Sequence, residues 1–289
     1  MAETRGARAP DMREWAPDLQ VIRAANAAPM TLDGTRSYVL GRARVVVVDP
    51  GPDDPDQLEA LAAAVGNRPV AAVLLTHAHA DHAEGAAAAA RRFKAEPAAS
   101  AQTLARLGLG GRALEDGETL GLDGATGGSA GSETTITAIH APGHSADHVC
   151  YLSMPDRRLF TGDLVLGEGS SAILHPDGSV ADCLASLARL IALRPTLLLP
   201  GHGPPVADAV RKLEEYRRHR LEREKQVLAA LAAGAATVPE IRRAVYGELP
   251  PGLVRAADAS VSAHLAALAA RGEEVPPFDE FGAAEDGHV

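Results

Sequence analysis

Short apolar runs recur along the first two hundred residues, separated by turn-rich or amphipathic stretches. Residues 45–48 are apolar and β-branched, which is typical of a strand buried on both faces, and the apolar run 70–75 predicts another strand. Residues 56–65 place apolar side chains at helical spacing, and helices are also expected over 83–93 and 180–193. Further strands are predicted at 21–22, 37–40, 118–122, 134–139, 149–153, 158–160 and 196–199.

After residue 205 the pattern changes to long helices. One charged helix is predicted over 206–231, a second from the N-cap Thr237 to about Gly247, and a third over 252–271. Residues 272–275 and 278–281 are expected to pair as a hairpin, which predicts a winged-helix-like module. We therefore divide the chain into a flexible leader (1–17), a main unit (18–207), this C-terminal module (208–281) and a disordered tail (282–289). A Gly-, Ser- and Ala-rich surface loop is expected at 123–133.

The composition is that of an ordinary globular protein, with 289 residues of which 46% are hydrophobic and 23% charged. A formal net charge of −10 disfavours a broad surface for nucleic acid. Two cysteines, Cys150 and Cys183, are too few for a disulfide framework and suit a reducing compartment. No apolar run approaches the roughly 20 residues of a membrane span, and the N-terminus has no apolar signal segment. We therefore expect a cytoplasmic protein that does not contact a membrane.

A cluster of polar side chains follows the predicted strand 70–75 and comprises His77, His79, Asp81 and His82. A packed core does not absorb these groups without partners, because each unpaired buried polar group costs about 1–3 kcal/mol. One or two metal ions would satisfy all of them. Side chains alternate along an extended chain, so His77 and His79 share one side, while Asp81 and His82 are expected at the turn into the next helix.

Three further candidate ligands lie near the ends of predicted apolar strands, namely His144, Asp163 and His202. Each follows a glycine, which lets the backbone approach closely. A catalytic zinc ion takes about three protein ligands, so these residues and the cluster together suffice for two ions. His140 and His148 are interpreted as hydrogen-bonded wall residues instead. Histidine and aspartate ligands without cysteine suit zinc, but also manganese or iron.

In this order and spacing, the motifs resemble those of the metallo-β-lactamase superfamily over roughly residues 20–205. The resemblance implies an α/β fold, a four-layer αβ/βα sandwich with two divalent metal ions at one edge, and a hydrolase whose catalytic domain is residues 18–207. The implied ligands of one metal are His77, His79 and His144, and those of the other are Asp81, His82 and His202, with Asp163 as the bridge.

The resemblance also implies roles for the acidic residues. Asp49, at the end of strand 45–48, would orient the cluster and would not bind metal. A water or hydroxide between the two metals would be the nucleophile, with Asp81 and Asp163 at the catalytic centre.

Three stretches are similar to the lactamase-β-like protein 2 subfamily: residues 29–41, the turn at 167–169 and the C-terminal helices. That subfamily includes an animal single-stranded RNA endonuclease, and similar fungal proteins hydrolyse acyl-carrier thioesters. The bridging Asp163 disfavours a true zinc β-lactamase, and the segment after it lacks the Cys-Gly-Arg stretch of glyoxalase II. Arg36, where the subfamily commonly carries Asn, and His175 are predicted to line the substrate cleft.

Three hypotheses about function follow. The first is an endonuclease on single-stranded RNA, supported by basic residues of helix 206–231, although interleaved glutamates favour an ordinary solvated helix face. The second is hydrolysis of a thioester, ester or lactone of a small or carrier-bound acyl substrate.

The third is DNA binding by the C-terminal module, which is disfavoured because helix 252–271 offers only Arg255 and Arg271. That module is expected to pack over the cleft or to form a homodimer contact. The basic residues of the first hypothesis are Arg211, Lys212, Arg217, Arg218, Arg220, Arg223 and Lys225.

Overall fold

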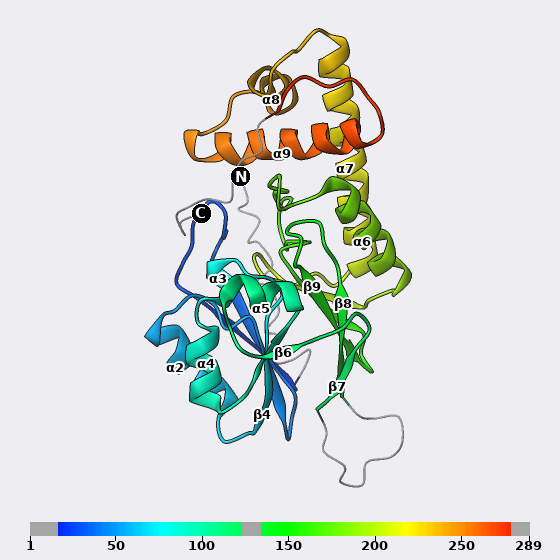
Figure 1. The fold of residues 1–289 in the computed structure, drawn as a ribbon. Helices are drawn as coiled ribbons and strands as arrows, with labels where there is room; N and C mark the ends of the chain where they lie inside the picture. The colour runs from blue at the N-terminus through cyan, green and yellow to red at the C-terminus, as the bar shows by residue number, and fades with distance from the viewer. Residues whose placement is uncertain (1–16, 123–133, 279–289) are drawn as a thin grey trace, which may run out of the picture.

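Two β-sheets pack face to face, with helices on the outer side of each, in a computed structural model that describes residues 17–122 and 134–278 (Figure 1). The first sheet has six strands in the order β1-β2-β3-β4-β5-β6, in which β1, β2 and β3 pair antiparallel and β3 to β6 pair parallel. Its strands are β1 (Leu19–Arg23), β2 (Arg36–Leu40), β3 (Val45–Val48), β4 (Val70–Leu74), β5 (Pro97–Ala99) and β6 (Arg112–Ala113).

The second sheet has five strands in the order β11-β10-β9-β8-β7, all antiparallel except for the parallel pair β10 and β11. Its strands are β7 (Thr119–Gly121), β8 (Thr135–His140), β9 (Val149–Met154), β10 (Arg158–Gly162) and β11 (Leu197–Pro200). Both sheets therefore contain parallel strands whose carboxyl ends share an edge, β3 with β4 in one sheet and β10 with β11 in the other.

Alternation along β3 shows how the layers are held together. Val46 and Val48 belong to the core between the sheets, whereas Val45 and Val47 pack against α2 (Pro55–Val65) on the outer face. Helices α4 (Ala86–Phe93) and α5 (Ala101–Leu107) cover the same face, and α6 (Val180–Ala192) covers the second sheet. The predicted four-layer αβ/βα sandwich is confirmed.

The segment after the polar cluster differs from the single helix predicted over 83–93. A short helix, α3 (Ala80–Ala83), precedes α4, and Gly85 separates the two. The Gly85 amide donates to Gly51 O at 2.9 Å, and a side chain at Gly85 would crowd the carbonyl oxygens of Gly51 and Pro52. Packing against the loop after β3 thus breaks a helix that the alanine-rich sequence alone would continue.

Three elements were missed from the sequence: β5, α5 and β6. They lie in residues 97–113, where short alanine-rich stretches show neither a clear period of two nor one of 3.6. They form because β5 pairs with β4 and β6 pairs with β5 at the edge of the first sheet.

The chain ends in three helices, α7 (Ala209–Ala232), α8 (Val238–Tyr246) and α9 (Pro251–Ala270). The first half of α7 packs on α6, and its second half packs with α8 and α9 in a core of their own. Figure 1 shows α9 crossing the direction of α7 at the end of the sandwich that carries α3. Thr237 caps α8 as predicted, since its hydroxyl accepts from the Glu240 amide at 3.4 Å.

The winged-helix detail is not confirmed. Residues 273–278 form no strand, and the second half of the predicted hairpin falls largely outside the described residues. The predicted surface loop 123–133, residues 1–16 of the leader and the tail 282–289 lie outside them as well. Within 17–122 and 134–278, no helix combines the length and apolarity needed to cross a bilayer.

Candidate metal centre

The ends of four strands converge at one edge of the sandwich and carry the candidate ligands. His77 and His79 follow β4, Asp163 follows β10 and His202 follows β11, while His144 lies in the loop before β9. The structure therefore brings together side chains that are far apart in the sequence, such as His82 and His202, which are separated by 120 positions.

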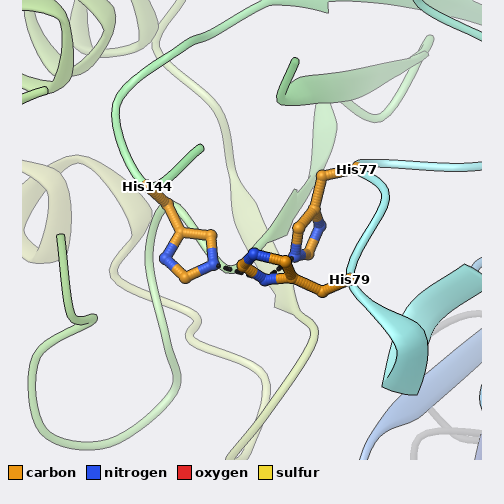
Figure 2. A group of neighbouring side chains, drawn as sticks. All are labelled: His77, His79 and His144. Atoms are coloured by element: carbon orange, nitrogen blue, oxygen red, sulfur yellow. Dashed lines mark hydrogen bonds between the residues drawn. The ribbon is translucent and has the colours of Figure 1, made fainter. Parts of the chain in front are cut away.

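Three of the histidines form a group without a carboxylate, drawn in Figure 2. His77 Nε2 lies 2.9 Å from His79 Nδ1, and His144 Nε2 lies 3.1 Å from the same atom. We call His77, His79 and His144 the three-histidine group. His77 and His144 are buried, and His79 is partly exposed.

The second group consists of Asp81, His82 and His202, which we call the carboxylate group. Asp81 Oδ2 lies 3.1 Å from His202 Nε2 and 3.4 Å from His82 Nε2. The two Nε2 atoms are 3.3 Å apart. Both rings are buried, whereas the Asp81 side chain is 22% exposed.

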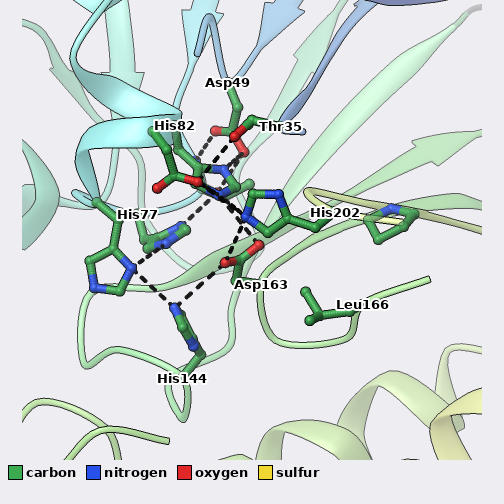
Figure 3. A network of polar contacts seen from close by, with 12 residues as sticks. Thr35, Asp49, His77, His82, His144, Asp163, Leu166 and His202 are labelled. Atoms are coloured by element: carbon green, nitrogen blue, oxygen red, sulfur yellow. Dashed lines mark hydrogen bonds and ion pairs between the residues drawn. The ribbon is translucent and has the colours of Figure 1, made fainter. Parts of the chain in front are cut away.

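Asp163 lies between the two groups (Figure 3). Its Oδ2 is 3.2 Å from His202 Nε2 and 3.8 Å from His144 Nε2, so one oxygen approaches both groups. Its Oδ1 is 3.3 Å from His82 Nε2. Gly201 makes this approach possible, because a side chain there would collide with the His82 ring and with the Asp163 carboxylate.

Hydrogen bonds at the far side of three rings fix where their protons lie. His144 Nδ1 faces the carbonyl of Ala172 at 2.8 Å, and His82 Nδ1 faces Asp49 Oδ2 at 2.8 Å. Both acceptors lack a hydrogen, so each Nδ1 must donate, and the lone pair of each neutral ring is on Nε2.

The same reasoning applies to His77. Thr76 Oγ1 donates its only hydrogen to Asp49 Oδ2 at 2.7 Å, so it accepts from His77 Nδ1 at 2.9 Å. When the rings are neutral, these three lone pairs point inward at other nitrogens or at carboxylates, which is an arrangement suited to a cation between them.

The sequence matches the model of the metallo-β-lactamase superfamily over residues 30–202. The chain belongs to the metallo-β-lactamase superfamily. This confirms the resemblance drawn from the five motifs, and it makes the protein a member of a superfamily of hydrolases whose fold typically binds two metal ions.

Two curated relatives of this superfamily protein span most of its length. It is 31% identical over 90% of its chain and 87% of the relative to a β-lactamase-like protein 2 homolog of Caenorhabditis elegans. It is also 31% identical over 83% of its chain and 77% of the relative to an atrochrysone carboxyl ACP thioesterase of Aspergillus fumigatus. The crystal structure of a metallo-β-lactamase family protein from Thermus thermophilus shares the fold, with a TM-score of 0.71, 23% identity, and coverage of 89% of this chain and 95% of that one.

The donor set fits divalent metal ions. Ligands at about 2.0–2.1 Å around a tetrahedral ion lie about 3.3 Å from one another. The nitrogen and oxygen atoms of the two groups are spaced at 2.9–3.4 Å. Asp163 Oδ1 is buried and accepts no hydrogen bond from the described part of the chain, so it has a lone pair to give.

The electrostatics of the carboxylate group favour a cation. Burial lowers the pKa of His82, but Asp81, Asp163 and Asp49 outweigh it and raise that pKa well above its ordinary value. Burial raises the pKa of Asp81, yet His82 and His202 lower it to about 2. The carboxylates are thus ionised at neutral pH and attract whatever positive charge occupies the site.

Two supporting residues were missed by the sequence analysis. Asp147 Oδ2 accepts from the Ala78 amide at 2.9 Å and so holds the backbone between His77 and His79. Thr35 Oγ1 donates to Asp81 Oδ2 at 3.1 Å. Nothing in the local sequence marks Asp147 or Thr35, because their partners lie 69 and 46 residues away.

His148 was interpreted from the sequence as a hydrogen-bonded wall residue, and the structure agrees. It is buried, stacks on His77 with ring centroids 5.1 Å apart, and its Nε2 accepts from the Asp163 amide at 3.2 Å. It therefore positions Asp163. His140 bonds the Leu114 carbonyl at 2.9 Å, which fits its interpretation as a wall residue.

The two predicted cleft residues have partners within the chain. Arg36 is 9% exposed and donates two hydrogen bonds of 2.8 Å to Asp33. His175 packs edge to face on Phe278, with ring centroids 5.6 Å apart. Contact of either residue with substrate stays a prediction. Cys150 and Cys183 are buried, as expected of small core residues.

Proposed function

We propose that this protein is a metal-dependent thioesterase that releases an acyl group from the thiol of a carrier. The observation that supports this most directly is Asp163, whose two oxygens reach both ligand groups of a hydrolase-type centre. The substrate class is supported by the relative named atrochrysone carboxyl ACP thioesterase. Esters and lactones are the neighbouring substrates, because they too are acyl groups with a carbonyl carbon.

The ligands we propose are His77, His79 and His144 for one ion, Asp81, His82 and His202 for the other, and Asp163 for both. Two bound divalent ions would lower the pKa of a water molecule and polarise the thioester carbonyl. The donor set suits zinc, and also manganese or iron, so metal analysis of the purified protein decides the identity.

The residues of the chain supply orientation and proton handling. Thr35 and His202 hold Oδ2 of Asp81, and among the described residues no contact engages Oδ1. Since Asp81 is ionised and partly exposed, we assign to Oδ1 the acceptance of a proton from the attacking water. Asp49 and Ala172 O hold the rings of His82 and His144 in the orientation that turns Nε2 inward.

The test is release of free thiol from a panel of acyl thioesters, followed with a thiol reagent. We expect hydrolysis that a chelator abolishes and that added zinc or manganese restores. Asp163→Ala should lose about 10³-fold in kcat/KM, since several kcal/mol of charge stabilisation depend on the site. The matched control is Asp182→Asn, an exposed acid on α6 that should retain full activity. A metal-loaded protein that leaves every thioester, ester and lactone intact contradicts the proposal.

Single-stranded RNA is the second candidate substrate, and the basic residues of α7 give it little support. Arg211 pairs with Asp208 and Glu215, and Lys225 pairs with Glu222. Net charge on that face is thereby reduced, as the interleaved glutamates predicted. Labelled RNA belongs in the same panel, and cleavage that depends on Asp163 would reverse the ranking. A homodimer through the C-terminal helices stays a prediction.

A further inference from the structure

Arg220 on α7 is a buried charge without a carboxylate partner. It is 5% exposed, and no carboxylate of the described residues lies within 4.0 Å of it, in contrast to Arg158, which is similarly buried and pairs with Asp18. Its guanidinium donates to the Ser171 carbonyl, and its Nε has no hydrogen-bond partner in the described chain. A buried cation is costly unless negative charge or hydrogen bonds compensate it.

A second guanidinium lies one turn further along the same helix. Arg223 stacks on the Tyr246 ring at 4.1 Å and donates to the Val245 carbonyl at 3.0 Å, so it is held in place by neutral partners. It too has no carboxylate within ion-pair distance among the described residues. Its Nη2 approaches His219 Nε2 at 3.5 Å, which puts the imidazole hydrogen of the neutral ring on Nδ1.

These residues adjoin the three-histidine group through two consecutive serines. Ser171 Oγ lies 3.1 Å from His144 Nδ1, and Ser170 Oγ lies 3.4 Å from His219 Nδ1. The α-carbons of adjacent residues are about 3.8 Å apart, so the distance from the metal centre to His219 is spanned by one peptide unit and two side chains. Ser170 and His219 are exposed and Arg223 is partly exposed, so a ligand can reach them from the solvent side.

The positive field of this cluster acts on its histidines. Burial, Arg220 and Arg223 together lower the pKa of His219. Burial and the same two arginines lower the pKa of His264, on the facing helix α9, to about 3. Among the acids of this part of α7, Glu222 pairs with Lys225 and Glu224 pairs with Arg271, so neither pairs with Arg220 or Arg223. The described residues therefore leave the charge of Arg220 and Arg223 uncompensated.

We propose that Ser170 and Arg223, oriented by His219 and with the charge of Arg220 beneath them, bind one anionic group of the substrate, a carboxylate or a phosphate. The assignment rests on the proposed thioesterase function. Guanidinium and hydroxyl donors suit the oxygens of both anions. A thioester offers two sources of such a group, a carboxylate on its acyl side or a phosphate on its thiol side. Binding there would anchor the substrate beside the metal centre.

The kinetic test compares matched thioesters that differ by one anionic group. Glutaryl and butyryl thioesters of N-acetylcysteamine report on the acyl side, and butyryl thioesters of phosphopantetheine and pantetheine report on the thiol side. Arg223→Gln should raise KM about tenfold for the anionic member of one pair, and less than twofold for its neutral match, with kcat retained. The pair that responds identifies the source. His219→Ala should act in the same direction by about threefold, and it leaves the stacking of Arg223 on Tyr246 intact.

The control is Arg217→Gln, which removes the same charge from an exposed position of α7 in the groove beside α6. It should leave all four KM values unchanged. Equal KM increases for anionic and neutral substrates, or no increase for any, would overturn the assignment. The thermal unfolding temperature of each variant shows whether a KM change comes from the lost contact or from destabilised packing of α8.

A binding experiment stands apart from activity. Inorganic phosphate and glutarate are titrated calorimetrically into the metal-loaded protein and the three variants. We expect weaker anion binding in Arg223→Gln and His219→Ala, and unchanged binding in Arg217→Gln. This result would support the anion site even if no thioester were hydrolysed, and the failure would then be that of the proposed function alone. Indistinguishable binding in all four proteins would refute the site, whatever the activity.

Discussion

The two ligand groups use the same imidazoles in opposite electrostatic settings. In the three-histidine group, burial and the neighbouring rings lower the pKa of His77 well below its ordinary value and that of His79 to about 4. In the carboxylate group, burial lowers the pKa of His202, but Asp163 and Asp81 outweigh it and raise it to about 9. The three-histidine group thus offers the lone pairs of neutral rings, whereas the carboxylates of the carboxylate group stabilise a positive charge.

The supports of the two groups differ in the same way. The loop of the three-histidine group is held at its backbone, where Asp147 accepts from the Ala78 amide. The carboxylate group is held at its side chains, where Asp49 bonds His82 and Thr35 bonds Asp81. We infer that the first group depends on the rigidity of its loop, whereas the second depends on charge. Four substitutions test that difference.

Asp163→Asn should have the largest effect, because this carboxylate approaches histidines of both groups. The amide keeps the shape and removes the charge, so metal should be lost from both groups and kcat/KM should fall about 10³-fold. Metal analysis after gel filtration through chelator-treated buffer gives the first readout. Full metal content in this variant would show that the two groups bind their ions independently.

Asp49→Asn should weaken the carboxylate group more than the three-histidine group, because Asp49 contacts His82 directly and reaches His77 only through the Thr76 hydroxyl. Asp49 accepts from the Thr76 amide, the Thr76 hydroxyl and His82 Nδ1, each within 2.8 Å. Loss of such a supporting partner typically lowers metal affinity 10–100-fold. Competition with a chromogenic chelator measures the affinity, and we expect a larger loss for one ion than for the other in each chain. An equal loss of metal affinity at both groups would contradict the distinction between them.

Asp147→Asn should act through stability. The carboxylate is buried and accepts from the Ala78 amide, from Thr103 Oγ1 at 2.9 Å and from Arg106 at 3.1 Å. We expect a loss of about 2 kcal/mol in the free energy of unfolding of the metal-free protein, measured with urea. Asp177→Asn is the matched control, since it removes the partly exposed partner of the same arginine and should cost at most about 1 kcal/mol. Equal effects would show that Asp147 has no special role in the loop.

Asp18→Asn gives the smallest effect and a reference for acid sensitivity outside the centre. Burial raises the pKa of Asp18, but its bidentate pairing with Arg158 outweighs this, so the folded pKa lies below the ordinary value of 3.8. Its contribution, about 1–2 kcal/mol, is therefore fully present above pH 3.8 and is lost as the pH falls through the lowered value.

Urea unfolding of wild type and Asp18→Asn at pH 7, 4.5 and 3 provides the check. The difference between the two proteins should persist at pH 4.5 and shrink at pH 3. A difference that grows on acidification would contradict the sign of the shift. Acid sensitivity in excess of this reference can then be assigned to the metal centre.

The sequence predicted the parts of the protein whose cause is local. The valines of residues 45–48 form β3 whatever surrounds them, because an apolar β-branched run has few alternatives. His77, His79, Asp81 and His82 were recognisable because so many polar groups after a buried strand need a common partner. His144, Asp163 and His202 were found for a related reason, since each follows a glycine at the end of an apolar segment.

Only the tertiary structure decided what these residues touch. The break at Gly85 arises from the loop after β3, and the support of the Ala78 amide comes from Asp147, 69 positions away. The unpaired charge of Arg220 is visible only once α7 is packed against the loop of Ser171. Residue types and their local order determine which chemistry is available. Hydrogen bonds and charge pairs between distant segments depend on how the layers pack, and no local pattern in the chain records that.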